Sequence, residues 1–539
     1  MAVLIQALRG TAVRDKWVML ALAMVLLATQ RAAAQVTTAQ YGNARTGAAT
    51  NETTLTPQNV RSATFGKIGT FEVDGDVYAQ PLYVPRLEIT NRGTHDVLFV
   101  ATEHGTLYAF DAINPRLPPL WKISFIDPAL DITPVPFRDA SCPFIKPEIG
   151  ITPTPVIDLE NGTLYVLMRT KEPTPRGDHR YVQRLHAINI HTGMDRLPPV
   201  EIRASVRGSG AGSRMGIVEF EPLRENPRAA LLLNRGVVYL SWASACDVGP
   251  FHGWIIAYDA KTLRQVGVFN ASPGGSEAGI WQGDAGLAAD TAGNVYAVTG
   301  NGSFNESGPL LDYGNTVLKL ALTPTGLVVR DYFTPSNQKQ LSTADLDLGS
   351  SGPVLIDEDR GPHRRMVVVT GKAGVSYMID RDKMGHYQPG DDPHAIITVQ
   401  TSESGFGAPA YWNQTLFIWG SNAVLKSYRV NGAGISAPIL SSVRSVDPGA
   451  TPTVSANGER NGIVWAIETR TWRGADKPAV LHAFDASDVR REIYNSEMIP
   501  GRDRAGIALR FAIPTVAAGR VYVGVKGAVD MYGLLAGNR

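Results

Sequence analysis

The chain has 539 residues, of which 44% are hydrophobic and 19% are charged, and its formal net charge is +1 at pH 7. This composition is ordinary for a globular protein, and a sequence without a block of like charge gives no support to a nucleic-acid-binding function. The 54 glycines and 35 prolines exceed average usage, as the turns of an all-β chain require.

Residues 1–34 have the pattern of a secretory signal peptide. Basic residues near the start precede an apolar run from Trp17 to Ala28, and Ala32–Ala34 offers a small-residue cleavage site before Gln35. The run is too short for a stable membrane span, so we expect cleavage and export, either to the periplasm or out of the cell. An uncleaved anchor is the alternative. Cleavage would remove four basic residues and one acidic residue and change the formal charge from +1 to −2.

One stretch, Thr106–Ala112, is repeated along the chain. It alternates apolar and polar residues and breaks into a turn at Asp111, which is typical of a half-buried β-strand. Seven weaker copies follow, at Leu185–Asn189, Ile256–Ala260, Leu318–Ala321, Tyr377–Asp380, Leu425–Tyr428, Leu481–Ala486 and Val529–Tyr532.

A pair of strand-like segments precedes each copy, and in the first unit these are Ala79–Val84 and Val97–Ala101. Eight such units predict an all-β fold, an eight-bladed β-propeller, because one sheet of this kind cannot bury both faces alone. The last unit is one strand short, so we expect the alternating segment Phe65–Val73 to complete the eighth blade and close the ring. The predicted mature chain is therefore an N-terminal extension at 35–64 and a propeller at 65–539.

Three insertions interrupt the repeats, at 113–150, 170–182 and 203–227, and we expect them to be long and irregular. The first is rich in proline and the third is rich in glycine. Binding sites tend to lie on long loops at one face of a scaffold, but loops that only cover the rim of the propeller are an equally good interpretation.

Cys142 and Cys246 are the only cysteines in the sequence. Export would allow a disulfide between them, and two separate thiols are the alternative. The sequence contains no Cys-x-x-Cys-His motif, so we expect no covalently attached c-type haem.

Polar residues at three predicted strand ends are the candidates for a binding site, since the sequence has no phosphate loop, zinc-protease motif or nucleophile elbow. Asn301 lies between glycines in the segment Thr299–Asn305, and its amide oxygen suits a hard cation. Lys372 lies at a strand-to-strand turn, and Asp247 ends another strand. Each has a purely structural alternative: a turn Asn with positive φ, a solvated hairpin Lys and an Asx-turn Asp.

These segments resemble the quinoprotein alcohol dehydrogenase superfamily, whose eight-bladed propellers hold pyrroloquinoline quinone (PQQ) and calcium on the axis. Thr299–Asn305 is similar to the segment with that family's calcium-binding Asn, which implies a metal- and cofactor-binding role for Asn301. Lys372 matches the basic residue that contacts the quinone, within a Lys-x-Gly-x-x-Tyr-x-x-Asp-Arg pattern. Asp247 lies close to the position of a calcium-binding Glu, which implies a metal ligand there.

The sequence also departs from that family. The segment 320–326, where the resemblance places the catalytic acid, has no acidic residue, so Asp345 and Asp347 downstream are the remaining candidates for the base. The adjacent pair of cysteines of many members is absent from the sequence. No aromatic residue stands in register to form the floor of the quinone site, and Trp281 lies nearby but out of register.

Two functions of different classes follow. The first is an exported dehydrogenase that uses PQQ and calcium to oxidise an alcohol or sugar, with a carboxylate as proton acceptor and an external electron acceptor. The alternative is a non-catalytic secreted propeller that binds a protein or glycan and holds no cofactor. The departures favour the alternative, and the Asn301 and Lys372 motifs favour the enzyme.

Overall fold

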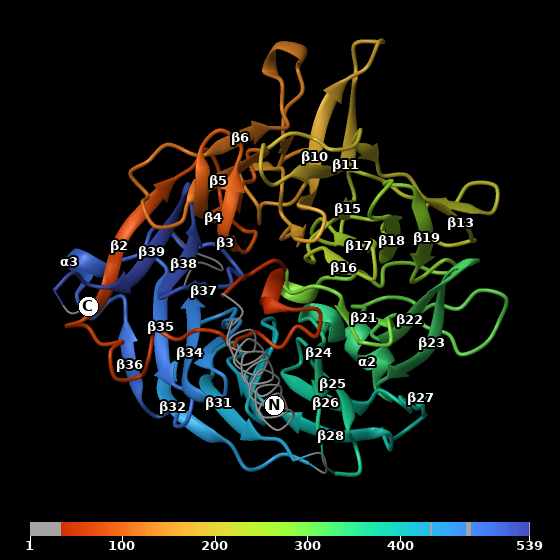
Figure 1. Ribbon diagram of the computed structural model, residues 1–539. Coiled ribbons are helices and arrows are strands. Elements are labelled where there is room, and N and C mark those ends of the chain that lie inside the picture. Colours follow the sequence, from red (N-terminus) through yellow and green to blue (C-terminus); the bar gives the residue numbers. More distant parts are fainter. Residues whose placement is uncertain (1–33, 360, 432–433, 470–475, 538–539) are drawn as a thin grey trace, which may run out of the picture.

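The structure, a computed structural model, describes residues 34–359, 361–431, 434–469 and 476–537. Residues 1–33 of the expected signal peptide therefore lie outside the described residues. Eight sheets stand around one axis as the blades of a propeller (Figure 1). The all-β, eight-bladed architecture predicted from the repeats is confirmed.

Each blade is an antiparallel sheet of four strands that runs from the axis to the rim. Blades 1 to 4 consist of β3 (Leu82–Ile89), β4 (Gly93–Ala101), β5 (Thr106–Asp111) and β6 (Trp121–Ser124); β9 (Val156–Asp158), β10 (Thr163–Pro173), β11 (His179–Asn189) and β12 (Val200–Glu201); β16 (Leu232–Asn234), β17 (Val237–Ser244), β18 (Trp254–Asp259) and β19 (Gln265–Asn270); and β20 (Ala288–Ala289), β21 (Val295–Val298), β22 (Val317–Thr323) and β23 (Gly326–Thr334). Blades 5 to 8 consist of β24 (Val354–Asp357), β25 (Arg365–Thr370), β26 (Val375–Asp380) and β28 (Ala395–Gln400); β29 (Ala410–Trp412), β30 (Thr415–Ile418), β31 (Val424–Arg429) and β32 (Ile439–Arg444); β33 (Thr453–Asn457), β34 (Arg460–Glu468), β35 (Val480–Asp485) and β36 (Glu492–Asn495); and β37 (Thr515–Ala517), β38 (Arg520–Val525), β39 (Ala528–Leu534) and β2 (Phe65–Glu72). The short strands β1 (Ala48–Ala49), β15 (Glu225–Asn226) and β27 (His386–Tyr387) extend blades 7, 3 and 4.

The N-terminal strand β2 closes the ring, as the sequence predicts. It pairs antiparallel with β39 at the C-terminal end, from Phe65 opposite Leu534 to Glu72 opposite Ala528 (Figure 1). The short helix α3 (Pro500–Asp503) packs beside it, and the amide of Lys67 donates to Oδ1 of Asp503 at 3.1 Å. Blade 8 therefore combines one strand from the N-terminal part of the chain with three strands from its C-terminal part.

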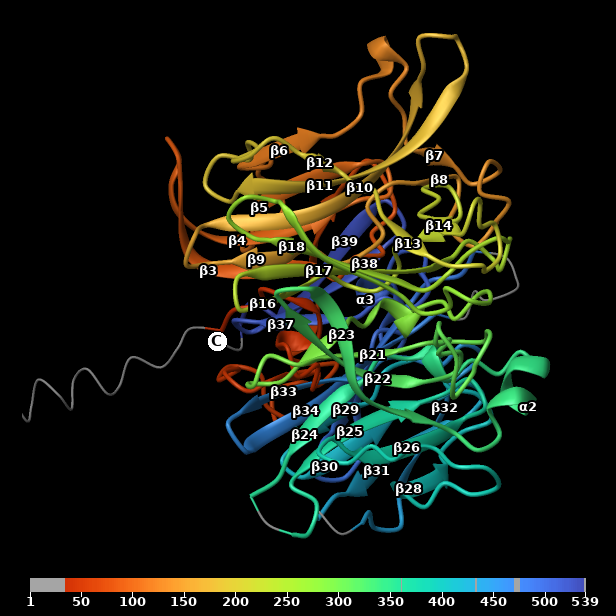
Figure 2. The ribbon, with the colours of Figure 1, turned by 90° about the vertical axis from the view of Figure 1, so that its right-hand side faces the viewer.

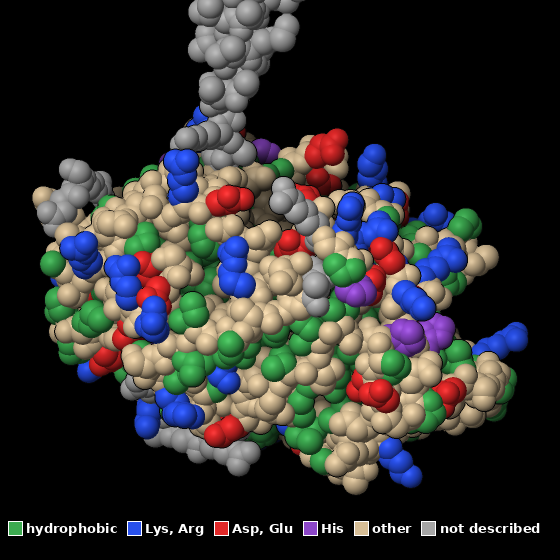
Figure 3. Space-filling view, turned by 90° about the horizontal axis from the view of Figure 1, so that it is seen from below, with side chains coloured by type: hydrophobic (Ala, Val, Ile, Leu, Met, Phe, Trp, Pro, Cys, Tyr) green, Lys and Arg blue, Asp and Glu red, His purple; other side chains and the backbone are tan. Residues whose placement is uncertain are grey.

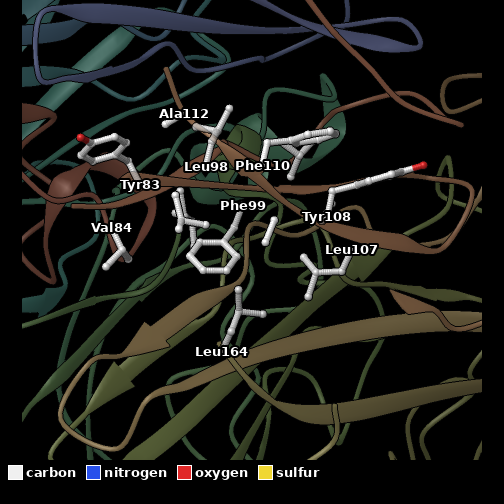
Figure 4. Close-up of a cluster of buried hydrophobic side chains, with 14 of the residues drawn as sticks. Tyr83, Val84, Leu98, Phe99, Leu107, Tyr108, Phe110, Ala112 and Leu164 are labelled. Carbon is white, nitrogen blue, oxygen red and sulfur yellow. The ribbon is translucent and has the colours of Figure 1, made fainter. Parts of the chain in front are cut away.

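The repeated strand is buried more deeply than its alternation suggests. All residues of β5 from Thr106 to Phe110 are buried, so the expectation of a half-buried strand was wrong there. The reason is that each blade packs against a neighbour on both faces, so polar and apolar positions alike are enclosed. Figure 4 shows this for blade 1, where Phe99 and Leu107 face Leu164 of the next blade.

The N-terminal extension crosses the axis and contacts every blade (Figure 1, red segment at the centre). We call residues 36–49 the N-terminal plug; it contains η1 (Ala39–Tyr41) and β1. It hydrogen-bonds to the innermost strand of all eight blades, at Tyr83, Ile157, Leu233, Ala289, Leu355, Tyr411, Val454 and Val516. The side chain of Arg45 is fully buried there and donates to four oxygens. The extension is thus an internal part of the ring.

The insertion at 170–182 is regular, which corrects the expectation of an irregular loop. It is the tip of the β10–β11 hairpin, which stays in register from Thr163 opposite Asn189 to Pro173 opposite His179. Glu172 is 8% exposed at its side chain and pairs with Arg180 and Arg184 across the hairpin. Opposite charges on facing strands stabilise such a pair, and the proline lies at the hairpin end where the ladder stops.

The other two insertions hold short elements separated by turns. The first contains η2 (Pro128–Leu130) and the paired strands β7 (Val135–Pro136) and β8 (Glu148–Ile149). The third contains the hairpin of β13 (Ser205–Arg207) and β14 (Ile217–Glu219). Figure 2 shows β7, β8 and β14 on the same side of the ring as the helix α2 (Gln338–Thr343).

The surface carries charges of both signs. On the face seen in Figure 3, Lys and Arg side chains are interspersed with Asp and Glu. Within the described part of the chain, no helix combines the length and apolar character that crossing a bilayer requires.

Candidate functional site

A cavity of about 570 Å³ lies on the propeller axis. Its walls are the segments that lead into the innermost strands of blades 3 to 8, the turns that follow β17, β25 and β30, and part of the first insertion. Asp247, Trp281, Asp345, Asp347 and Lys372 line it. Its volume lies within the range of about 300–1,000 Å³ that is typical of small-molecule sites. We call it the axial cavity.

Lys372 is placed by the tight turn between β25 and β26. Gly374 in this turn has φ +72°, which a glycine adopts without steric cost. The Lys372 amide donates to the carbonyl of Asp347 at 2.8 Å, and its Nζ lies 2.7 Å from Oδ2 of Asp345 and 3.5 Å from Oδ2 of Asp347. The lysine is therefore the counter-ion of both candidate bases.

Asn301 follows β21 and is bonded to the same two carboxylates. Its amide N–H donates to Oδ1 of Asp347 at 2.8 Å, and its Nδ2 donates to Oδ1 of Asp345 at 3.1 Å. Its own Oδ1 accepts from Nδ2 of Asn315 at 3.1 Å. A side chain at Gly300 would put Cβ within 2.3 Å of Asp347, so the close approach of this strand end to the acid requires glycine.

Asp345 and Asp347 lie between α2 and the short helix η4 (Leu348–Ser350) and differ in environment. The Asp345 side chain is 73% exposed and has a left-handed backbone with φ 56°, whereas the Asp347 side chain is 14% exposed. Burial raises the pKa of Asp347, and the negative charges of Asp345 and Asp247 add to that rise. Asp345 is thus the acid that faces the cavity, and Asp347 is the acid that is held in the wall.

Asp247 belongs to the same electrostatic group. Its amide donates to Oγ of Ser244 at 2.8 Å, and that hydroxyl donates back to Oδ1 of Asp247 at 3.2 Å. Surrounding protein raises the pKa of Asp247, with Asp345 as a further cause and Lys372 opposing it. The structure therefore brings Asp247, Asp345, Asp347 and Lys372 together at one cavity, and Asn301 is bonded behind them.

Glu277 is a fourth carboxylate of this group, and no sequence motif points to it. The residue after it, Ala278, donates its amide to the carbonyl of Asn301 at 2.7 Å. Burial raises the pKa of Glu277, and Asp347 and Asp345 raise it further. Only the fold brings this loop beside Asn301, so no spacing in the chain could have identified it.

The donor set suits a hard cation. Carboxylates and an amide oxygen are the ligands that calcium prefers, and the mutual repulsion that raises these pKa values would be relieved by added positive charge. Among the residues that the structure describes, no three His, Cys, Asp or Glu side chains form a preassembled metal cage. A cation at Asp345 would have to take the place of the Lys372 ammonium group.

Aromatic residues and a disulfide provide the apolar walls. Trp281, which is out of register with the family pattern described above, lines the cavity, and so do Phe144, Phe406 and Phe511. Cys142 and Cys246 form a disulfide with Cα atoms 5.4 Å apart, and both line the same cavity. The question left open by the cysteine spacing is thus answered by a bridge between the first insertion and blade 3.

Two arginines complete the wall, and sequence reasoning missed both. Arg228 lies over the ring of Phe511 at 4.7 Å from its centroid, and Arg510 lies over Phe144 at 3.9 Å. Both arginines line the axial cavity although they are 7% and 9% exposed. The cavity wall therefore carries basic and aromatic groups as well as carboxylates.

The sequence matches no family model and no curated protein. Solved structures resemble it in fold. A quinohemoprotein alcohol dehydrogenase of Pseudomonas putida HK5 aligns with a TM-score of 0.61 at 13% identity, over 93% of this chain and 80% of that one. The quinohemoprotein alcohol dehydrogenase of Comamonas testosteroni gives 0.57 at 13% identity, over 95% and 82% of the two chains. A europium-containing methanol dehydrogenase gives 0.58 at 13% identity, over 93% and 98%. At this identity the similarity establishes only that this chain shares the propeller fold of these proteins.

Proposed function

We propose that this chain is an exported dehydrogenase that binds PQQ together with calcium or a similar hard cation and oxidises an alcohol or sugar. One observation carries the proposal: Lys372 and the acids Asp247, Asp345 and Asp347 line one axial cavity, and Asn301 is hydrogen-bonded to two of those acids. The signal-like segment at 1–34 and the disulfide support export to an oxidising compartment.

The cation would be held by the acidic group at the cavity. Asp347 and Asp247, which line the cavity, and Asn301 and Glu277, which do not, would supply the oxygen donors that a hard cation takes. One protein of the same fold is a europium-containing methanol dehydrogenase, so a trivalent ion is included in the proposal beside calcium.

A bound quinone of this kind supplies a carbonyl that accepts hydride from the substrate. Lys372 would donate to the quinone oxygen and stabilise the negative charge that develops there. Asp345, which is the cavity-facing acid, would take the proton of the substrate hydroxyl. Trp281 and the disulfide would place apolar groups beside the reacting centre. The electrons would leave to an external acceptor, because the sequence has no c-type haem motif.

Two of the three departures from the family pattern give less support to a non-catalytic propeller when the lining of the cavity is considered. Trp281 lines the axial cavity despite its register, and a disulfide reaches the cavity from cysteines that are far apart in sequence. The third departure is that the segment 320–326 has no acidic residue. In the proposal, Asp345 takes the role of that acid.

Calorimetric titration of the mature protein with PQQ in the presence of calcium tests the proposal. We expect saturable binding that weakens about tenfold or more in Asn301→Ala and Lys372→Ala, since each removes a polar partner at the site. Lys339→Ala, an exposed lysine on the neighbouring helix α2, is the matched control and should bind as the wild type does. Absence of heat at high micromolar PQQ would reject the cofactor site and leave a propeller that binds a protein or glycan.

If binding is found, oxidation of a panel of alcohols and sugars, coupled to an artificial electron-accepting dye, identifies the substrate class. Asp345→Asn should bind PQQ but lose roughly two to four orders of magnitude in rate, because the proton acceptor is removed. Asp347→Asn should instead weaken the affinity for the cation. An Asp345→Asn enzyme with the wild-type rate would reject this residue as the base.

A further inference from the structure

The Cys142–Cys246 disulfide joins two parts of the cavity wall that are 104 residues apart in the chain. Cys142 lies in the first insertion, which comes between blades 1 and 2, and Cys246 follows the end of β17 in blade 3. Both residues line the axial cavity, and so do the residues Phe144, Ile145 and Asp247 that follow them closely. The bridge therefore connects an insertion loop to the strand end that carries a candidate cation ligand.

Residues 137–149, which we call the roof segment, pack outside the blade cores. Ala140, Ile145 and Ile149 belong to a small buried cluster that is separate from the blade cores. Other contacts of this segment include Asp139 with Lys171 at 2.8 Å, Glu148 with His104 at 2.6 Å, the hydroxyl of Tyr78 donating to the carbonyl of Phe144 at 3.2 Å, and Arg510 over the Phe144 ring at 3.9 Å. A small satellite cluster under a long loop opens more easily than a blade core, so the covalent bridge is a main constraint on this segment.

The backbone at the other end of the bridge is in an unfavourable conformation. Cys246 and Asp247 both have φ 55°, which is uncommon for residues other than glycine. The local support is the pair of hydrogen bonds between Ser244 and Asp247. Such a conformation persists only when its surroundings impose it, and the disulfide is the covalent restraint at this turn.

We propose that the Cys142–Cys246 disulfide is a positioning element that fixes the Asp247 carboxylate in the axial cavity and holds the roof segment over it. The proposal rests on the proposed function only in that it takes Asp247 as a cation ligand. Without the bridge, the turn at 246–247 relaxes, Asp247 leaves the acidic group, and the roof segment moves independently of blade 3.

Terbium(III) is a suitable probe of the cation site, because its luminescence can be excited through Trp281 in the same cavity. Three variants of the mature protein are compared with the wild type: Cys142→Ser/Cys246→Ser, Asp247→Asn, and the combination of all three substitutions. We expect the terbium affinity to fall roughly tenfold in the double cysteine variant and in Asp247→Asn, which is the usual cost of losing a ligand or its positioning partner. The combined variant should be no weaker than either, since both act through the same carboxylate.

Amide hydrogen exchange of the ligand-free protein provides a readout that does not depend on binding. In the double cysteine variant, exchange should rise roughly tenfold in the roof segment and at 244–249, with the blade strands unchanged. Wild-type protein whose disulfide is reduced with a phosphine after folding should show the same increase in exchange. This measurement replaces the double cysteine variant if that variant does not fold. Unchanged exchange, additive losses of terbium affinity, or wild-type protein without terbium binding would overturn the proposal. If only PQQ binding fails, the proposed function is rejected. The role of the disulfide is then still tested by the terbium affinities and the hydrogen exchange rates.

Discussion

Nζ of Lys372 lies 2.7 Å from Oδ2 of Asp345, so the lysine ammonium group is paired with a carboxylate that a bound cation would also contact. A metal ion and this ammonium group repel each other, whereas a quinone oxygen is attracted by both. We therefore expect Lys372→Met to have opposite effects on two ligands. Terbium(III) affinity without quinone should rise roughly tenfold, and PQQ affinity in the presence of calcium should fall by a similar factor.

Luminescence titration and calorimetry measure the two affinities separately. Lys339→Met on the exposed face of α2 controls for a general change in net charge, and neither affinity should change in it. Weaker terbium binding by Lys372→Met would contradict the view that Lys372 and the cation share these carboxylates.

The affinity for a cation should increase with pH. Burial and neighbouring acids raise the pKa values of Asp347, Asp247 and Glu277, so these groups retain protons above the ordinary carboxyl range. A cation must displace those protons, and its affinity therefore falls as pH drops through the raised values. In the ligand-free protein the same shifts make folding stability decrease as pH rises through this window, because the unfolded chain loses its protons first.

Thermal unfolding with and without calcium measures both effects. The increase in midpoint caused by calcium should be larger at about pH 7 than at about pH 4, and Asp347→Asn should reduce that difference. An equal calcium effect at both pH values would show that these carboxylates do not hold the ion.

The sequence contained enough to predict the ring but only part of the site. Period-two alternation and turns recur because every blade packs both of its faces against neighbouring blades. The closing strand at Phe65 was predicted because the last unit is one strand short. Asn301 and Lys372 could be selected as candidates because each lies in a local glycine-containing turn with a recognisable pattern. Arg510 reaches the cavity, and Glu277 reaches the acidic group beside it, only through the order of blades around the axis, which leaves no local pattern in the chain.

The N-terminal plug illustrates the same limit. Its hydrogen bonds go to backbone groups of eight different strands, and backbone partners impose no residue type at the other end. The hairpin at 170–182 was missed for a different reason: its prolines suggest a loop, whereas the ladder simply ends at Pro173.

Glu103 should make the protein less stable as pH rises. Its side chain is 1% exposed, accepts hydrogen bonds from the amide of Gly150 and the hydroxyl of Thr152, and burial raises its pKa from 4.5 to about 8. Between these two values the unfolded chain releases the proton and the folded chain keeps it. Stability should therefore decrease by up to about 1.4 kcal/mol per pH unit from this group alone.

Glu103→Gln removes the titration and keeps an acceptor of the same shape. Its urea midpoint should be close to that of the wild type at pH 5 and clearly higher at pH 8, with Glu148→Gln at the partly exposed neighbouring site as the control. Parallel pH profiles for Glu103→Gln and the wild type would show that Glu103 does not stay protonated in the folded protein.

Arg45 should anchor the N-terminal plug. Its guanidinium group is fully buried and donates to the carbonyls of Leu287, Ala39 and Leu231 and to the hydroxyl of Thr38, at 2.7 to 3.1 Å. Arg45→Met leaves these oxygens without their donor, so we expect a loss of at least about 3 kcal/mol. Urea denaturation measures it, and Arg92→Met at the surface should stay within about 0.5 kcal/mol of the wild type. If Arg45→Met and Arg92→Met lower the free energy of unfolding equally, the buried hydrogen bonds of Arg45 do not stabilise the protein.

Phe65 should decide whether the ring stays closed. It is fully buried at the start of β2, with its ring centroid 4.9 Å from that of Tyr494 and 5.5 Å from that of Trp465. Phe65→Ala removes this packing at a cost of about 3–5 kcal/mol, whereas Phe65→Leu should retain most of it. If the loss releases β2, the edge of β39 becomes free to pair with another chain.

Urea denaturation combined with size-exclusion chromatography separates the two consequences. We expect Phe65→Ala to have the lower midpoint and to form dimers or larger species below the transition, and Phe65→Leu to remain monomeric to the same extent as the wild type. A strongly destabilised Phe65→Ala that never associates would indicate that β2 stays paired with β39 and that the ring is closed by its backbone ladder alone. The backbone register from Phe65–Leu534 to Glu72–Ala528 would then be the sufficient closure, and the aromatic contacts would stabilise only the blade that it completes.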